Sequence, residues 1–507
     1  MNQPIQPSSD PAGPYATLNP YGGGPQPPPP PPPPSSARRR RGRALLAAAA
    51  ALLVLGGAGA WYATSGDARD DKRPTAAGSG PSPAAAPSGS ASASATPSGL
   101  DAAAAGRVNA ARKADEAKLL YLRRNAVDVP NMGADNLGPW QVGDTVVTAM
   151  YRTVTAYSAA DGREKWSLPL RADLCTATPH MTADNRIVVV TKEGPGRKGE
   201  CRRLQVVDLK TGRAGWERIV AQEHRSDSLM DFSLAFVGDT LAVGRPGAFS
   251  TYRMSDGERL YGSPAGSCTP STFAGGPKLI AAVSCLVGGA DKEVQELDPA
   301  TGKARWSYRL PPGSRVEGVL SVKPLVVVFA DNETGENRRA VALTEDGALR
   351  STLADAAEFQ PYCAEDMLDD CRAVVDSGTL YVATDGAPDG SKGDEILAVD
   401  LATGKTARRI SLPVEAISSP IGMSGRDLLI NVSPLDGGWE GVASVAPGAT
   451  EPRVLMRAPV ERVRKDWRLS GSTPLYADGR YILVAERVSG FTDAEERDVV
   501  LMTAFGT

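Results

Sequence analysis

The chain has 507 residues, with 56 basic and 59 acidic side chains and a formal net charge of −3. From residue 67 onward the net charge is −7, which excludes a nucleic-acid partner, because binding to phosphate backbones needs a positive surface. The two histidines, His180 and His224, are isolated in the sequence, so no His-based metal or nucleophile motif is present, and we expect ordinary surface or loop residues.

The first 43 residues predict a disordered, proline-rich cytoplasmic tail. Eight consecutive prolines, Pro27–Pro34, favour a stiff polyproline II segment, and five arginines lie between Arg38 and Arg43. These arginines indicate that the N-terminus stays on the cytoplasmic side of a membrane.

Residues 44–63 contain no charged side chain, and twenty residues are enough for about 30 Å of helix. We therefore predict one transmembrane helix and a single-pass plasma-membrane protein with its C-terminal part extracytoplasmic. A cleaved signal peptide is the alternative, since Ala58-Gly59-Ala60 resembles a cleavage site. Residues 64–117 are rich in Ala, Ser and Pro, which predicts a disordered linker that ends in a short helix.

Residues 118–507 carry a repeated turn after an apolar, β-prone stretch. Six of these turns end in a glycine, and successive glycines are 50, 45, 45, 45 and 57 residues apart: Gly162, Gly212, Gly257, Gly302, Gly347 and Gly404. A period in this range is typical of a β-propeller with one four-stranded sheet per repeat.

An aromatic residue follows four positions after the first four of these glycines. These residues are Trp166, Trp216, Tyr261 and Trp306. We expect them on the last strand of each sheet, where a large ring fills the wedge between neighbouring blades. Ser351 and Arg408 occupy the same position in the next two repeats, which predicts different packing there.

Two further units complete the ring. A degraded seventh turn ends at Gly448, and residues 498–505 match the third strand of an eighth repeat whose fourth strand is missing. Residues 118–123 resemble a fourth strand, so we expect the N-terminal segment to close the last blade. The sequence thus predicts an all-β, eight-bladed propeller at about 49 residues per blade, with seven blades as the alternative.

The turns and tryptophans, as in residues 298–306 and 397–405, resemble the pyrroloquinoline-quinone-type (PQQ-like) propeller repeat. This family includes quinoprotein alcohol dehydrogenases, the outer-membrane assembly lipoprotein and the sensor domains of some actinobacterial kinases. If the chain resembled the dehydrogenase branch of this family, the resemblance would imply a quinone in the central channel, held against a disulfide of adjacent cysteines, and a bound calcium ion. No Cys-Cys pair occurs here, so we expect no cofactor.

All six cysteines lie beyond the predicted membrane segment, which favours disulfides in an oxidising compartment. Pairing between sequence neighbours keeps each bond inside one repeat. This is one of fifteen connectivities, and the sequence leaves the others open. The favoured pairs are Cys175 with Cys201, Cys268 with Cys285, and Cys363 with Cys371.

Two loops carry candidate binding residues. Asp385, Asp389, Asp394 and Glu395 could surround a calcium ion, but they lack the alternating spacing of an EF-hand, so we favour a solvated acidic hairpin. Trp439 lies in a glycine-rich stretch outside the blade-packing register. It could be an exposed anchor for a partner or pack within its loop.

The sequence therefore favours a non-catalytic, membrane-anchored propeller that binds an envelope protein or a small ligand. Two alternatives stay open, a quinoprotein dehydrogenase-like enzyme and an accessory sensor in envelope signalling.

Overall fold

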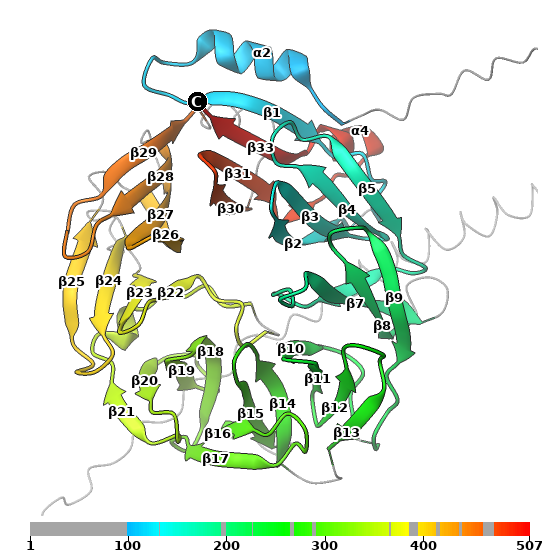
Figure 1. The fold of residues 1–507 in the computed structure, drawn as a ribbon, viewed down its shortest axis with the longest axis vertical. Coiled ribbons are helices and arrows are strands. Elements are labelled where there is room, and N and C mark those ends of the chain that lie inside the picture. Colours follow the sequence, from blue (N-terminus) through cyan, green and yellow to red (C-terminus); the bar gives the residue numbers. More distant parts are fainter. Residues whose placement is uncertain are drawn as a thin grey trace, which may run out of the picture. The chain divides into compact units, whose positions relative to one another are not determined.

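Eight antiparallel sheets surround a central axis like the blades of a propeller (Figure 1). The computed structural model describes residues 99–507 with these exceptions: 131, 194–198, 226, 264–267, 286–290, 365–366, 385–393, 412–415, 435–438 and 460–470. The predicted tail 1–43, the predicted membrane segment 44–63 and most of the predicted linker lie outside the described residues.

Blades 2 to 7 are four-stranded sheets whose strands follow in sequence order from the inner edge to the outer edge, and blade 1 has the same order with β32 (Arg487–Val488) added beside β2. Blades 1 to 4 contain β2 (Ala134–Val142), β3 (Thr145–Met150), β4 (Thr153–Ser158), β5 (Glu164–Pro169), β6 (Leu174–Ala177), β7 (Arg186–Glu193), β8 (Glu200–Asp208), β9 (Arg213–Ile219), β10 (Ser233–Val237), β11 (Thr240–Arg245), β12 (Ala248–Arg253), β13 (Arg259–Gly262), β14 (Cys268–Ala274), β15 (Leu279–Cys285), β16 (Asp291–Leu297) and β17 (Ala304–Arg309). Blades 5 to 7 contain β18 (Ser314–Val322), β19 (Leu325–Asp331), β20 (Arg339–Leu343), β21 (Leu349–Thr352), β22 (Ala373–Val375), β23 (Thr379–Ala383), β24 (Glu395–Asp400), β25 (Thr406–Ser411), β26 (Ala416–Ser424), β27 (Asp427–Pro434), β28 (Glu440–Val445) and β29 (Arg453–Ala458).

Blade 8 joins the two ends of the propeller. Its strands are β30 (Ser472–Ala477), β31 (Arg480–Ala485), β33 (Val500–Gly506) and β1 (Lys118–Arg124). Strand β1 pairs antiparallel with β33, so the N-terminal segment supplies the fourth strand that the C-terminal repeat lacks. The predicted closure and the eight blades are confirmed.

Four short elements lie outside the regular four-stranded pattern of the ring. They are α2 (Ala102–Ala111), η2 (Ala356–Glu358), β32 (Arg487–Val488) and α4 (Asp493–Asp498). Helix α2 is the short helix expected before the closing strand. Asp101 caps it by accepting the N–H of Ala104 at 2.8 Å, and its buried side chains pack in the same cluster as Leu119 and Leu122 of β1.

The repeated glycines have two structural tasks. Each of the six adopts a positive φ, between 69° and 82°, which a glycine reaches without strain. Each of the first five also lies under an aromatic ring of the preceding blade, so that a Cβ at Gly347, for example, would come within 2.3 Å of the Trp306 ring. The predicted packing between blades therefore consists of an aromatic ring stacked on the backbone of a glycine turn.

We expect Gly347→Ala to destabilise the propeller more than Gly425→Ala does. Gly425 also has a positive φ, 62°, but a Cβ there meets nothing within 4 Å, so this control measures backbone strain alone, about 1–2 kcal/mol. The clash with Trp306 should add about 1–3 kcal/mol. Urea unfolding of both variants measures the difference, and equal losses would contradict the stacking role.

Ser351 and Arg408, which take the place of the aromatic residue in two repeats, pack differently from it, as predicted. At the junction of blades 5 and 6, Ser351 Oγ donates to the carbonyl of Leu401 at 2.9 Å. At the next junction, Arg408 Nη1 donates to the carbonyl of Ala449 at 2.9 Å. Polar contacts thus replace the aromatic ring where the repeat lacks one.

The propeller has two unlike faces. Because neighbouring strands are antiparallel, the turns from first to second and from third to fourth strand lie on one side, which we call the turn face. The connections from second to third strand and from blade to blade lie on the other side, the loop face. The loop face carries the longer connections, including residues 220–232 and 486–499.

The two α-helices of the described part have ten and six residues, and neither is long and apolar enough to cross a membrane. Ten residues span about 15 Å, half of what a bilayer core needs. This finding contradicts the predicted single-pass plasma-membrane localisation. The segment on which that prediction rested, 44–63, lies outside the described residues.

Candidate functional site at the channel strap

The inner strand of blade 6 is interrupted by an excursion into the ring. Phe359 pairs with Thr384, and the N–H of Gln360 donates to the carbonyl of Ala383 at 2.7 Å. Regular pairing resumes at Ala373. Between these points the described residues 361–364 and 367–372 leave the sheet, and we call them the channel strap.

A disulfide closes the base of the channel strap. Cys363 and Cys371 are bonded, and the N–H of Arg372 donates to the carbonyl of Pro361. A Cβ on Gly318 of β18 would lie 2.4 Å from the sulfur of Cys363, so blade 5 can pack against the bond only because it has a glycine there. The disulfide thus holds together the two ends of the excursion beside the blade 5 wall.

The channel strap contacts blades on several sides of the ring. Met367 packs in the core between blades 2 and 3, where its sulfur accepts the N–H of Leu234 at 3.4 Å. Leu368 packs between blades 4 and 5, and its carbonyl accepts the N–H of Val319 at 2.6 Å. Arg372 pairs with Glu486 of blade 8. In Figure 1 this part of the chain runs from β22 through the middle of the ring toward β10, so the channel strap braces the propeller internally.

Asp369, next to Leu368, forms part of a cavity of about 330 Å³ on the turn face. The cavity is lined by turns of blades 2, 3 and 4, including Thr178, Met181 and Phe236. Asp369 Oδ2 accepts the N–H of Gly275 at 2.7 Å. The Asp369 side chain is only 9% exposed, and this burial raises the pKa of its carboxyl group.

His180 lies at the rim of this cavity with an exposed side chain. Its Nε2 is 3.1 Å from the carbonyl oxygen of Asp369 and 3.9 Å from Oδ2. The sequence did not indicate this meeting, because His180 and Asp369 are 189 residues apart and the loop geometry that joins them is not periodic. His180 is therefore an exposed loop histidine, as expected, that also contacts the channel strap.

The other two cysteine couples are also bonded in the structure, each inside one blade. Cys175 joins Cys201 in blade 2, and Cys268 joins Cys285 in blade 4. All three disulfides join cysteines that are neighbours in the order of the sequence, which is the pairing that the sequence favoured.

We expect the oxidised protein to contain three intramolecular disulfides. Alkylation before and after reduction, followed by mass spectrometry, should show no reactive thiol before reduction and six after it. Each bond should contribute about 2–4 kcal/mol to the free energy of unfolding, and more for the longer loop from Cys175 than for the one from Cys363. Thiols that react without reduction would contradict the assigned pairs.

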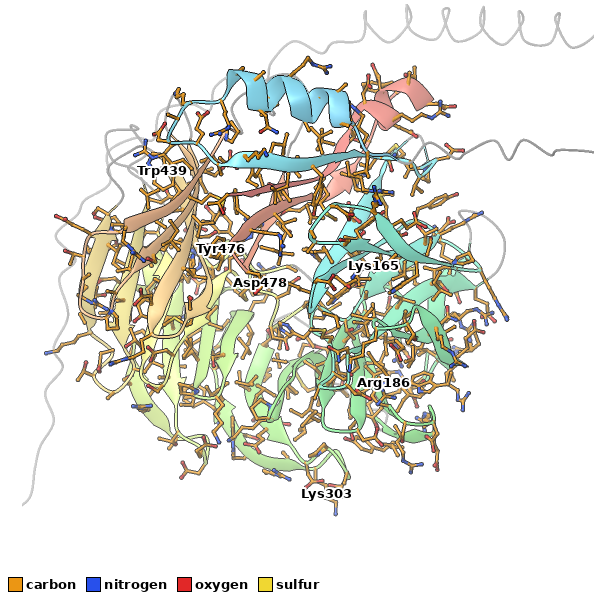
Figure 2. All side chains as sticks on the ribbon, turned by 45° about the horizontal axis from the view of Figure 1, so that its top comes forward. Lys165, Arg186, Lys303, Trp439, Tyr476 and Asp478 are labelled. Atoms are coloured by element: carbon orange, nitrogen blue, oxygen red, sulfur yellow. A yellow bond between two sulfur atoms is a disulfide. The ribbon has the colours of Figure 1, made fainter. Side chains whose placement is uncertain are left out.

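Trp439, labelled in Figure 2, is partly buried on blade 7. It packs against the core cluster of blades 6 and 7, and the guanidinium carbon of Arg457 lies 5.6 Å from its ring centroid. Its role as a partner anchor stays a prediction, and the packing seen here is the alternative that the sequence left open.

The acidic loop is described only at its end. Asp385 and Asp389 lie outside the described residues. Asp394 accepts the N–H of Ser418 at 3.3 Å, while Glu395 pairs with Arg409 at 3.2 Å and accepts from Ser411 at 2.7 Å. Both carboxylates therefore join strands, and among the described residues no group of three or more His, Cys, Asp and Glu side chains could hold a metal ion.

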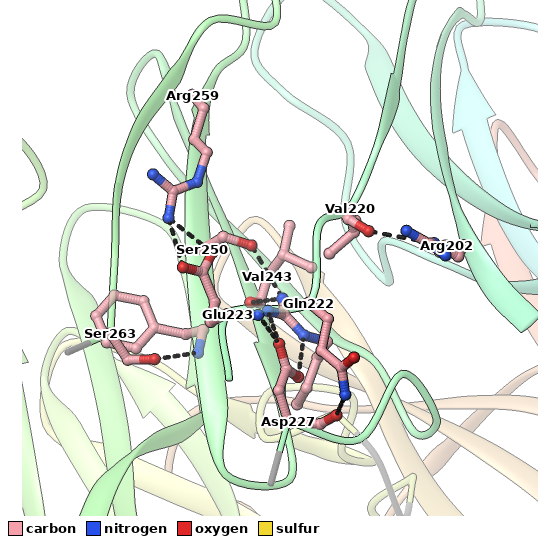
Figure 3. Close-up of polar contacts among 11 residues, drawn as sticks. Arg202, Val220, Gln222, Glu223, Asp227, Val243, Ser250, Arg259 and Ser263 are labelled. Carbon is pink, nitrogen blue, oxygen red and sulfur yellow. Dashed lines mark hydrogen bonds and ion pairs between the residues drawn. The ribbon is translucent and has the colours of Figure 1, made fainter. Parts of the chain in front are cut away.

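A buried ion pair in blade 3 was not indicated by the sequence. Arg245 Nε and Nη2 each donate to Asp227, both at 2.8 Å, and both side chains are fully buried (Figure 3). Arg245 also donates to Ser250 Oγ at 2.9 Å, and Asp227 accepts the N–H of Glu223 at 2.8 Å. His224, half-buried in the same loop, accepts the N–H of Asp227 with its carbonyl oxygen. The pair fixes the long connection between blades 2 and 3.

The residues present do not fit a quinone held in the centre of the ring. The channel strap packs against both walls of the channel, through Met367 on one side and Leu368 on another. The cysteine pair of the channel strap is Cys363 with Cys371, which are eight positions apart in the sequence rather than adjacent. The described residues of the channel strap thus cross the middle of the ring (Figure 1).

One family model matches part of the chain. A family model described as outer membrane protein assembly factor BamB matches residues 128–269, which contain blades 1 to 3. No curated protein sequence matches the chain.

Three solved structures are similar at low identity. BamB from Moraxella catarrhalis is 13% identical, with a TM-score of 0.42 over 76% of this chain and 100% of that chain. A quinohemoprotein alcohol dehydrogenase from Pseudomonas putida HK5 is 13% identical, with a TM-score of 0.44 over 75% of both chains. The Pan2 WD40 domain of Neurospora crassa is 11% identical, with a TM-score of 0.36 over 60% of this chain and 86% of that chain. All three scores are below 0.5, too low to support a conclusion about function. The chain is therefore an eight-bladed propeller that resembles the PQQ-like family, with the sequence match located in its first three blades.

Proposed function

We propose that this propeller is a non-catalytic scaffold that binds a partner protein on its loop face. The observation that carries this proposal is the gathering of exposed apolar side chains there. Phe491 is 94% exposed and Met132 is 72% exposed, and Met230 is also exposed. Burying such side chains on binding is favourable, and exposed apolar groups rimmed by polar residues mark interaction sites.

Phe491 and Met132 come from neighbouring segments. Strand β32 pairs with the start of β2, with Val488 opposite Ala134. Arg487 donates to the carbonyl of Met132 and pairs with Asp135. These contacts hold the two connections together, so the apolar side chains are presented from a fixed base.

Two grooves lie between the segment beside Met132 and Met230. One, of about 230 Å³, lies between the start of blade 1 and blade 2, and another, of about 640 Å³, continues toward blade 3 past Met230. Leu174 and Cys175 line both grooves. The docking surface, as we define it, therefore consists of Met132, Phe491, Met230 and these two grooves.

Site-specific photo-crosslinking tests this docking surface. A photoreactive residue at position 491 or 132 should capture one discrete partner, and the same residue at Val454, an exposed apolar position on the last strand of blade 7, should not. The variant Met132→Ser/Phe491→Ser should weaken that partner's binding at least about tenfold while leaving the unfolding temperature unchanged. Equal capture from position 454 would contradict the loop-face assignment.

The enzyme alternative makes a separate prediction. With pyrroloquinoline quinone and calcium added to the purified protein, we expect no dye reduction with alcohols or sugars and no tight quinone binding, because the channel strap occupies the centre of the ring. Calorimetry and a dye-linked assay measure both, and a known quinoprotein dehydrogenase serves as positive control. Turnover would overturn the non-catalytic proposal.

A further inference from the structure

We propose that the turn-face cavity binds a small organic cation, with an apolar body and one protonated amine, and that Asp369 is its counter-ion. This site is independent of the loop-face docking surface, since it lies on the opposite side of the propeller. The cavity volume of about 330 Å³ is at the lower end of the range for ligand pockets, so the ligand is small.

Asp369 lacks the partner that a buried carboxylate needs. Its Oδ2 has one hydrogen bond, from the backbone of Gly275, and its Oδ1 has no hydrogen-bond partner among the described residues. Burying a charge without an opposite charge is costly, and a bound cation would remove that cost. Burial raises the pKa of Asp369, as expected for a carboxyl group with no permanent cation beside it.

Asp227 is a buried carboxylate with only a structural role, and its contacts can be compared with those of Asp369. There, Arg245 supplies a guanidinium with two hydrogen bonds at 2.8 Å. No Lys or Arg is found among the described residues that line the turn-face cavity. Among the described lining residues, His180 is the one basic side chain; it is 3.9 Å from Oδ2, is largely solvent-exposed and carries a charge only when protonated. The position for a permanent cation is thus open.

The rest of the cavity determines the body of the ligand. Met181 and Phe236 give apolar walls, and Gly275 and Gly276 contribute backbone without side chains. An aromatic or branched aliphatic group fits such walls, because burying its surface is favourable. A methionine sulfur also makes favourable contacts with aromatic rings. We therefore assign an arylalkylamine-like chemistry rather than a polyamine or a sugar.

Isothermal titration of the whole protein with benzylamine, benzyl alcohol and benzoate tests this assignment. The three probes share one ring and differ in charge. We expect benzylamine to bind at least about tenfold more tightly than benzyl alcohol, the factor that a hydrogen bond to a charged group supplies, and benzoate not to bind. Equal binding of amine and alcohol, or preferred binding of benzoate, would overturn the proposal without any variant.

A pair of matched variants locates the binding. Asp369→Asn keeps an oxygen for the Gly275 N–H but removes the charge, and it should abolish the preference for the amine. Asp478→Asn makes the same change on a turn of blade 8 (Figure 2), where φ is 51° and asparagine is tolerated, and it should bind benzylamine as the wild type does. Loss of the preference for benzylamine in both variants, or in neither, would contradict the role of Asp369.

Discussion

Replacing Arg245 with methionine is expected to lower the free energy of unfolding by about 3–5 kcal/mol, because Asp227 is left charged and buried without its partner. Urea unfolding followed by circular dichroism measures the loss. The double variant Arg245→Met/Asp227→Leu should recover much of it, because removing both partners leaves no buried charge.

Arg253→Met is the matched control for this substitution. Arg253 lies on the neighbouring strand β12 and pairs with Asp256 and Glu258 on the surface, where water screens the charges. We expect the urea unfolding midpoint of Arg253→Met to match that of the wild type within error. A loss at Arg245 no larger than the loss at Arg253 would contradict a structural role for the buried pair.

The effect of Arg245→Met should depend on pH. Burial alone raises the pKa of Asp227, but the hydrogen bonds from Arg245 and from the N–H of Glu223 outweigh it and hold that pKa below its ordinary value. A lowered folded-state pKa contributes stability above the unfolded value of about 3.9, and that contribution is lost as the pH falls through the folded value. In Arg245→Met burial acts on Asp227 without the guanidinium, so the stability gap between wild type and variant should be largest at neutral pH and shrink as the pH falls.

Leu119→Ala/Leu122→Ala is expected to unfold most of the chains at room temperature or to lower the melting temperature sharply. Both leucines of β1 are 1% exposed, and each truncation of a buried leucine costs about 2–5 kcal/mol. Their sum is comparable with the whole stability of a typical domain, about 5–15 kcal/mol. Loss of β1 from blade 8 also exposes the edge of β33.

Leu349→Ala is the control for ring closure. Leu349 also lies on the outermost strand of its blade, β21, but its side chain is exposed. We expect no measurable change in thermal unfolding from this variant. If the β1 double variant melted at the same temperature as Leu349→Ala, the closing strand would not be essential to the ring.

The repeat of turn and aromatic residue was readable in the sequence because it is a local signal. Glycines such as Gly347 need a positive φ within one hairpin, and Trp306 follows at a fixed distance. The same local pattern located the closing strand 118–123, whose Tyr121 lies over Gly162 as Trp306 lies over Gly347. The predicted single-pass localisation is contradicted, since no helix of the described part is long and apolar enough to cross a membrane, and the segment 44–63 on which it rested lies outside the described residues.

The sequence by itself therefore determined the eight blades, their order and their closure, because hairpins and their spacing are set by residues close together in the chain. Only the tertiary structure decided the candidate site. The channel strap leaves blade 6 where no repeat predicts it, and it brings Asp369 to His180 and Gly275, residues that belong to blades 2 and 4. Arg245 and Asp227 likewise meet through the path of a long connection. Such meetings depend on how loops close across the ring, and no periodicity in the sequence encodes them.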